Sequence, residues 1–176
     1  MSTDMRFPIG PFLHEGAIDS TQRDAWISDI EELPEKLATA LIGLNDDQLD
    51  TPYRDGGWTV RQVAHHLADS HMNSFIRFKL ALTEEHPSIK PYFEEKWALL
   101  EDTVKAPLAL SLELLRGLHG RWALLLRSLT EDDFSRTFFH PGSQTIVPLS
   151  EALGTYSWHG KHHVAHITKL REKMGW

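Results

Sequence analysis

Four stretches of this sequence space their apolar residues three and four positions apart, which is the period of a helix with one buried face. In the clearest stretch, after Pro107, the inward positions alternate between the two spacings; they are Leu108, Leu112, Leu115, His119, Trp122, Leu126 and Leu129. The other stretches cover residues 20–44, 59–83 and 150–174. Helices of this kind bury their apolar faces against one another, so the pattern predicts an all-α fold, a four-helix bundle.

Local signals indicate where these helices begin and bend. Thr59 and Gln62 have the Thr-x-x-Gln spacing of a capping box, which predicts a helix start at that point. Pro107 suits the first turn of the helix that follows it. Pro34 has no amide hydrogen to donate inside a helix, so we expect it to interrupt or kink the first helix.

The segments between the four helices are rich in turn-forming residues. Residues 1–19 contain two prolines and two glycines, among them Gly16, and are expected to be an irregular lead-in. We expect a short helical segment over residues 94–102 and a short extended piece over residues 145–147. No stretch reads as a convincing sheet, and residues 1–176 are expected to form a single domain.

Charge and hydropathy narrow the classes of partner. The formal net charge is −7, whereas non-specific nucleic-acid binding needs a basic surface, so we expect no nucleic-acid partner. No apolar run approaches the roughly 18 residues of a membrane span, and the first residues lack a signal-peptide core. These features lead us to expect a cytoplasmic protein with no membrane partner. We expect its partner to be a small-molecule substrate.

The chain contains no cysteine, and four of its eleven histidines lie within eight residues near the C-terminus. Any metal site must therefore use imidazole and oxygen ligands. Two pairs have the four-residue spacing that lets helical histidines share an ion, His159 with His163 and His162 with His166. At 100° per residue, the first pair points toward the apolar face of the helix. His162 falls toward solvent, so we interpret His162 and His166 as solvated or supporting residues.

A third ligand has to come from another helix, and the spacing alone does not select it. The helix over residues 59–83 offers His65 on its polar face, His66 on the flank of its apolar face and His71 nearer the centre of that face. Periodicity slightly favours His71. His119 on the next long helix also points inward, so these alternatives stay open.

Several segments resemble one known family along essentially the whole chain. They are Tyr53–Gln62, His65–Asn73, Leu118–Trp122 and Trp158–His166. In these segments the sequence is similar to the YfiT branch of the DinB/YfiT-like proteins. The resemblance implies a four-helix bundle that holds a divalent metal on three histidines, which correspond here to His66, His159 and His163. It also implies a homodimer, to which Trp97 and Trp176 are candidate contact residues, and it leaves His71 and His119 as candidates for the pocket wall.

Three neutral imidazoles leave a coordination position for water or substrate, which is typical of a catalytic metal site. The activity that the resemblance implies is that of a metal-dependent hydrolase. Zinc suits three histidines and one water, nickel comes next in affinity, and Fe²⁺ or Mn²⁺ would suit additional oxygen ligands. One alternative is an S-transferase that joins a low-molecular-weight thiol of the bacillithiol type to an electrophile; another is a bundle that binds a metal or ligand without catalysis.

Three charged residues are candidates for the catalytic groups. Asp69 lies one helical turn from His66 and could orient that ring or a substrate, although an exposed aspartate is an equally good interpretation. Arg77 and Arg121 could each hold an anionic group of the substrate, or could be ordinary surface arginines. The loop Tyr53–Trp58 is a candidate for the pocket mouth, and tight packing of the loop explains its residues as well.

Overall fold

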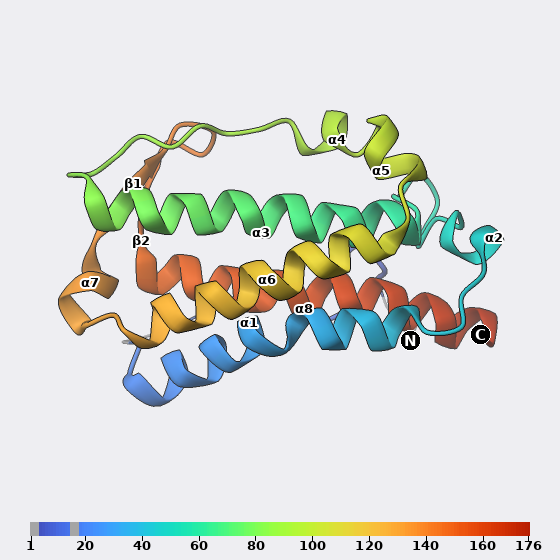
Figure 1. Ribbon diagram of the computed structural model, residues 1–176, viewed down its shortest axis with the longest axis horizontal. Helices are drawn as coiled ribbons and strands as arrows, with labels where there is room; N and C mark the ends of the chain where they lie inside the picture. The colour runs from blue at the N-terminus through green and yellow to red at the C-terminus, as the bar shows by residue number, and fades with distance from the viewer. Residues whose placement is uncertain (1–3, 15–17) are drawn as a thin grey trace.

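The computed structural model describes residues 4–14 and 18–176, and it contains the expected bundle of four long helices (Figure 1). These helices are α1 (Ser20–Leu41), α3 (Val60–Thr83), α6 (Leu108–Arg127) and α8 (Leu149–Met174). The prediction of an all-α four-helix bundle is confirmed. α1 continues through Pro34 without ending there. Part of the expected lead-in, including Gly16, lies outside the described residues.

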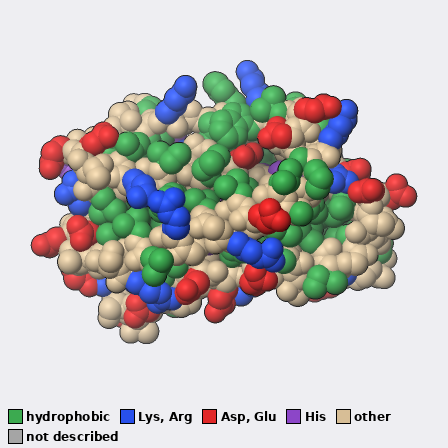
Figure 2. All heavy atoms as spheres, viewed as in Figure 1, with side chains coloured by type: hydrophobic (Ala, Val, Ile, Leu, Met, Phe, Trp, Pro, Cys, Tyr) green, Lys and Arg blue, Asp and Glu red, His purple; other side chains and the backbone are tan. Residues whose placement is uncertain are grey.

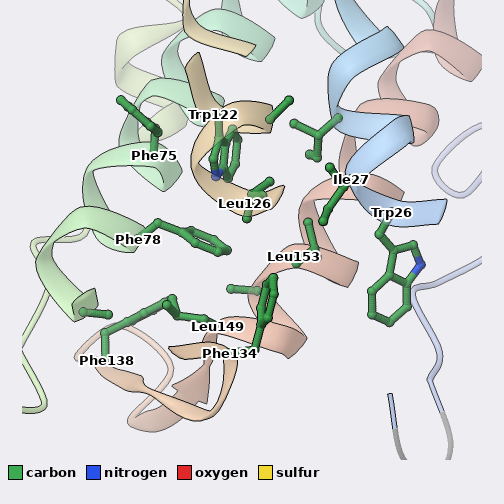
Figure 3. Close-up of a cluster of buried hydrophobic side chains, with 14 of the residues drawn as sticks. Trp26, Ile27, Phe75, Phe78, Trp122, Leu126, Phe134, Phe138, Leu149 and Leu153 are labelled. Atoms are coloured by element: carbon green, nitrogen blue, oxygen red, sulfur yellow. The ribbon is translucent and has the colours of Figure 1, made fainter. Parts of the chain in front are cut away.

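Each long helix packs against two neighbours. α1 lies against α8 and α6, and α3 lies against α6 and α8. One apolar cluster, drawn in Figure 3, joins the start of α1 and α8 to the ends of α3 and α6, with Trp122 and Phe78 fully buried in it. A second cluster, with Leu37 and Leu67, joins the opposite ends of the same helices. His71, His119 and His159 lie between the two clusters along α3, α6 and α8, so the bundle has a polar middle section. On the face of the molecule drawn in Figure 2, hydrophobic side chains lie between charged ones.

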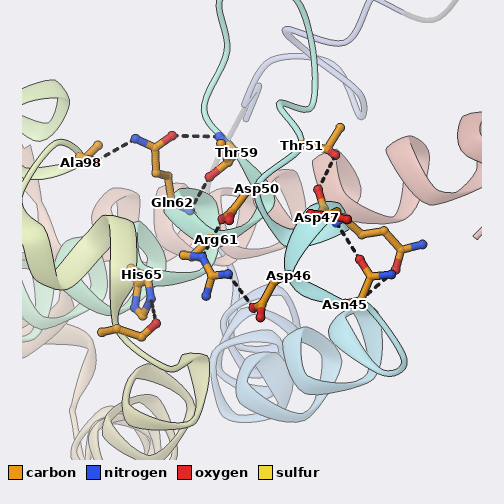
Figure 4. Close-up of polar contacts among 12 residues, drawn as sticks. Asn45, Asp46, Asp47, Asp50, Thr51, Thr59, Arg61, Gln62, His65 and Ala98 are labelled. Carbon is orange, nitrogen blue, oxygen red and sulfur yellow. Dashed lines mark hydrogen bonds and ion pairs between the residues drawn. The ribbon is translucent and has the colours of Figure 1, made fainter.

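The start of α3 is fixed by the capping box that the sequence predicts (Figure 4). The hydroxyl of Thr59 accepts from the amide of Gln62 at 3.1 Å, and the Gln62 side chain accepts from the amide of Thr59 at 2.9 Å. The side-chain amide of Gln62 also donates to the carbonyl of Ala98 at 2.7 Å. These contacts anchor α3 two turns before His66, which sets the direction in which that ring projects.

The connections contain short elements that the sequence only partly indicates. The expected helix over residues 94–102 is two short helices, α4 (Glu94–Trp97) and α5 (Glu101–Lys105), and the expected extended piece is strand β2 (Thr145–Pro148). β2 pairs antiparallel with β1 (Thr137–His140), so the expectation of no sheet is wrong for this one hairpin. The helices α2 (Asp46–Leu49) and α7 (Glu131–Ser135) were not expected either.

The hairpin and the connection between α3 and α4 contact each other at one side of the bundle. Ile89 donates its amide to the carbonyl of Phe139 at 3.0 Å, and Phe138 of β1 is buried in the apolar cluster. Within the described part of the chain, no helix combines the length and the hydropathy that crossing a membrane requires.

Candidate metal centre

Three histidines from two helices converge in the middle section of the bundle. His66 comes from α3, and His159 and His163 come from successive turns of α8. One ring nitrogen of each lies within 4.8 Å of the others. The Nε2 atoms of His66 and His159 are 3.3 Å apart, and the rings of His66 and His163 have centroids 4.9 Å apart. This arrangement brings three nitrogen donors from distant parts of the chain to one point.

All three rings are held in the neutral form that binds metal ions. Burial lowers the pKa of His66 to about 4. Burial, with the neighbouring histidines, also holds the pKa values of His159 and His163 well below the usual range. At neutral pH each ring therefore keeps a lone pair on one nitrogen, which is the state required of a ligand. The donor set fits a divalent cation of intermediate softness.

Two further histidines lie within hydrogen-bond distance of the outer ring nitrogens of His159 and His163. Nδ1 of His159 lies 3.2 Å from Nε2 of His71, and Nδ1 of His163 lies 3.3 Å from Nδ1 of His166. A proton on the outer nitrogen of His159 and of His163 would leave Nε2 of each free to face the centre. Hydrogen bonds of this kind fix the tautomer and the orientation of a ligating ring.

The expectation that His162 points to solvent is wrong, because other parts of the chain cover that face of α8. Both His162 and His166 are buried. Trp158 stacks on His162 with ring centroids 4.4 Å apart, and Phe7 packs against the same ring at 6.3 Å. Tyr53 stacks on His166 at 4.0 Å. A helical wheel of α8 alone contains no information about this cover.

The loop Tyr53–Trp58 covers the centre from one side. The ring of Trp58 lies 4.6 Å from that of His66 and 6.4 Å from that of His163, measured between centroids. The amide of Tyr53 donates to the carbonyl of Trp58 at 3.1 Å, which closes the loop on itself. The loop therefore packs tightly and also shields two of the converging rings from water.

A cavity of about 710 Å³ opens beside His159, which is only half-buried. Arg77 lines it, and its Nη1 donates to the hydroxyl of Tyr156 at 3.4 Å. The ring of Tyr156 lies 5.5 Å from that of His159. Ser70 and Tyr92 line the same cavity. Arg77 is thus the charged candidate that the structure brings to the centre.

The other two charged candidates lie elsewhere. Arg121 is exposed on α6 with its guanidinium 5.8 Å from the ring centroid of Phe75, and it does not line the cavity. Asp69 is half-buried, and burial together with the charge of Asp102 raises its pKa to about 6. No hydrogen bond joins the Asp69 carboxylate to His66 in the described ranges, so it does not orient that ring as suggested.

The remaining histidine candidates are structural. His65, expected on a polar face, is buried where α5 meets α6: its ring nitrogens lie 2.7 Å from the hydroxyl of Ser111 and 3.1 Å from the carbonyl of Ala106 (Figure 4). His119 is fully buried, donates to the carbonyl of Ile30 and stacks on His71 with centroids 4.9 Å apart.

Periodicity did not single out the tyrosines of the cavity as functional residues. Tyr156 precedes His159 by three positions on the inward stripe of α8, so that stripe was an available signal. Tyr92 reaches the cavity from the irregular segment before α4, and no periodic signal marks it.

Comparison with known proteins places this fold and site among relatives. A family model described as "DinB superfamily" matches residues 21–167. The Bacillus subtilis (strain 168) protein named "Putative metal-dependent hydrolase YfiT" is 55% identical over 99% of this chain and 98% of its own length. A Bacillus mycoides (strain KBAB4) relative with the same functional description is 57% identical over 98% and 99%, respectively.

Solved structures agree with that placement. The structure of YfiT, described as "a probable metal-dependent hydrolase with an unusual four-helix bundle topology", matches with a TM-score of 0.96 over 98% of this chain and 99% of that one. A second four-helix bundle protein, TT2238, is 18% identical and matches with a TM-score of 0.56 over 84% of this chain. The second likeness concerns the fold alone.

Proposed function

Because the chain belongs to the DinB superfamily and to its YfiT-like group, we propose that it is a hydrolase that works with a divalent metal ion held by His66, His159 and His163. The observation that carries the proposal is the convergence within 4.8 Å of three neutral ring nitrogens, from the buried His66 and His163 and the half-buried His159. A divalent cation bound in this way supplies Lewis acidity, which polarises a carbonyl group and lowers the pKa of water.

The residues around the centre have roles that follow from their contacts. His71 and His166 orient the rings of His159 and His163 through their outer nitrogens. Tyr53 and Trp58 exclude water on the closed side, where Tyr53 stacks on His166 and Trp58 packs against His66. The cavity beside His159 gives a small substrate its way to the centre. An ester or amide would enter from this open side.

The metal itself is proposed as zinc, with nickel second, since three imidazoles and an open position suit tetrahedral Zn²⁺. Elemental analysis of protein purified without a histidine tag tests this, because a tag would bring in ions of its own. We expect one zinc ion per chain. If the analysis found one iron or manganese ion per chain and no zinc, the choice of metal would be overturned, but the proposal of a three-histidine site would stand.

The hydrolase proposal is tested with metal-loaded protein on a simple ester and a simple anilide. We expect His159→Ala to lower hydrolysis at least about 100-fold and to lose the metal, because one of three ligands is gone. His86→Ala is the matched control, since His86 is exposed and its ring contacts Thr137. Neither residue lines the cavity beside His159. Circular dichroism checks that both variants fold.

Two results would contradict the proposal. Hydrolysis that survives His159→Ala would show that the centre does not perform the reaction. Turnover that requires an added low-molecular-weight thiol, with the thiol recovered in the product, would identify an S-transferase in place of a hydrolase.

A further inference from the structure

The guanidinium of Arg77 is half-buried in the cavity without a carboxylate partner. Its one hydrogen bond to a side chain in the described ranges is the 3.4 Å contact with the Tyr156 hydroxyl, and it forms no ion pair there. A guanidinium has five N–H donors in a planar fork, and those of Arg77 that do not meet Tyr156 remain open to the cavity, where an anion can accept from them. This part of the cavity is therefore suited to an oxyanion.

Tyr156 connects this cation to the metal centre. Its hydroxyl meets Nη1 of Arg77 at 3.4 Å and the hydroxyl of Ser70 at 3.5 Å, while its ring lies 5.5 Å from that of His159. Arg77 and His159 thus lie on two sides of one tyrosine and line the same cavity. A molecule that reached the centre from this side would pass within contact of the guanidinium.

We propose that Arg77 binds a carboxylate of the substrate, so that this enzyme hydrolyses esters or amides of carboxylate-bearing compounds. The inference rests on the proposed function and adds the substrate class to it. A carboxylate accepts two parallel hydrogen bonds from a guanidinium, which fixes orientation as well as position. The reacting carbonyl would then lie toward His159, separated from the carboxylate by about the length of one tyrosine side chain.

A carboxylate fits this cavity better than a phosphate dianion. The charged residues of the lining are two cations, Arg77 and Lys96, and three anions, Glu94, Glu95 and Glu151. Their sum is −1, and Lys96 lies over the ring of Phe93, 4.8 Å from its centroid. The glutamates would therefore repel a second negative charge on the ligand, and the other cation of the described lining, Lys96, lies over an aromatic ring and not beside Arg77 in a shared fork.

The test compares two p-nitrophenyl esters, the neutral acetate and the half-ester of glutarate, whose free end is a carboxylate. We expect Arg77→Gln to raise KM about tenfold or more for the glutarate half-ester and to leave KM for the acetate unchanged. An ester with a phosphonate end distinguishes the second oxyanion. Arg127→Gln is the matched control, because Arg127 is an exposed arginine of α6 paired with Glu31.

A binding measurement separates this inference from the hydrolase proposal. Glutarate is titrated into the metal-loaded protein and into its Arg77→Gln variant by calorimetry, and inorganic phosphate is the competing anion. If no ester is hydrolysed and glutarate still binds in an Arg77-dependent way, the proposed reaction fails while the carboxylate site stands. Equal KM changes for both esters, stronger binding of phosphate, or glutarate binding unaffected by Arg77→Gln would overturn the site.

Discussion

At the scale of single residues, Asp69 carries a charge that the fold disfavours at neutral pH. Its pKa rises from 3.8 to about 6 on folding, because burial and the charge of Asp102 both oppose ionisation. A raised carboxylate pKa means that the folded state binds the proton more tightly. Its contribution to stability is therefore fully present below about pH 4 and is lost as the pH rises through about 6.

Asp69→Asn should consequently stabilise the protein at neutral pH. The shift corresponds to about 3 kcal/mol at full burial, and the partial exposure of the side chain reduces the expected gain to about 1 kcal/mol. Urea unfolding at about pH 8 and about pH 4 measures it. A variant that is no more stable at the higher pH, or equally stabilised at both, would contradict the assignment.

His71 is a positioning residue for His159, and its removal should affect metal binding more than folding. His71→Phe keeps an aromatic ring in the core but removes the acceptor 3.2 Å from Nδ1 of His159. We expect metal affinity to fall about 10- to 100-fold. The measurement is a competition titration with a chelating dye.

A matched variant separates orientation from packing. His71→Gln retains a side-chain oxygen that accepts a hydrogen bond, so it should recover part of the affinity that His71→Phe loses. Equal affinity in all three proteins would show that the contact does not orient His159.

The residues of the centre were predictable to different degrees from the sequence. The four-residue spacing of His159 and His163 on an apolar stripe indicated that they project together into the bundle, and the structure has them so. His66 lies on the flank of its helix, so periodicity favoured His71, and only the family resemblance pointed to His66. Phe7 and Trp158 cover the ring of His162. The contact with Phe7 depends on tertiary packing, which a helical wheel of α8 does not include.

At the scale of elements, α8 approaches α1 at glycines where a larger side chain has no room. A Cβ on Gly154 would lie 2.8 Å from the ring of Trp26 and 2.8 Å from that of Phe12. Trp26 is buried in the apolar cluster and cannot easily move. The close contact of α1 with α8 therefore requires glycine at this position.

Gly154→Ala should destabilise the protein by about 1–2 kcal/mol, because overpacking outweighs the gain of about 1 kcal/mol in helix propensity. Gly120→Ala in α6 is the control: a Cβ there meets open space, so only the gain in propensity applies. Urea unfolding of both variants gives the comparison. Stabilisation by Gly154→Ala would show that the two helices can separate at low cost.

The long helices were predictable as elements because their apolar period and their start signals agree. The capping box at Thr59 placed the start of α3 correctly. The short elements were less accessible, since α2 and α7 span four and five residues and offer too few positions for a period. β1 has only four residues and no clear alternation of buried and exposed positions, and it lies in a polar, turn-rich connection, so no strand pattern was visible there.

At the scale of the whole molecule, a bound metal ion should stabilise the fold, because its ligands come from α3 and α8 and meet only in the folded chain. A ligand specific for the folded state adds about 2.7 kcal/mol at a hundredfold excess over its dissociation constant. We expect a chelator to lower Tm, and a stoichiometric amount of zinc to restore it. His159→Ala should remove the response; a chelator effect that persists in this variant would place the ion elsewhere.

The metal-free protein should lose stability in mild acid. Burial lowers the pKa of His119 to about 4, whereas the unfolded chain titrates near 6.5. As the pH falls from about 6.5 toward about 4, the unfolded state takes up a proton that the folded state refuses, which costs up to about 3 kcal/mol from this residue. The same direction holds for His66 and His166.

Urea unfolding at about pH 7 and about pH 4.5 measures the loss. Asp69 works in the opposite direction over part of this range, but one carboxyl does not offset several buried histidines. A stability that stays constant or increases between the two pH values would mean that these rings are accessible to protons in the folded protein.

The overall architecture followed from the sequence because four amphipathic helices have few ways to bury their apolar faces. The arrangement of the site did not, because it depends on which helices are neighbours. His66 contacts His159, which lies ninety-three positions later in the chain. Spacing within one helix is readable from the sequence, while the relative rotation of two helices is set by packing such as that of Gly154 on Trp26.

The position of two ligands on the last helix has a consequence for the order in which the protein matures. His159 and His163 lie on α8, and α8 must pack against α3 before their ring nitrogens can meet that of His66. No segment of the chain presents all three nitrogens by itself. Acquisition of the ion is therefore a late event in folding, because a chain whose α8 has not yet packed cannot hold the ion with all three histidines.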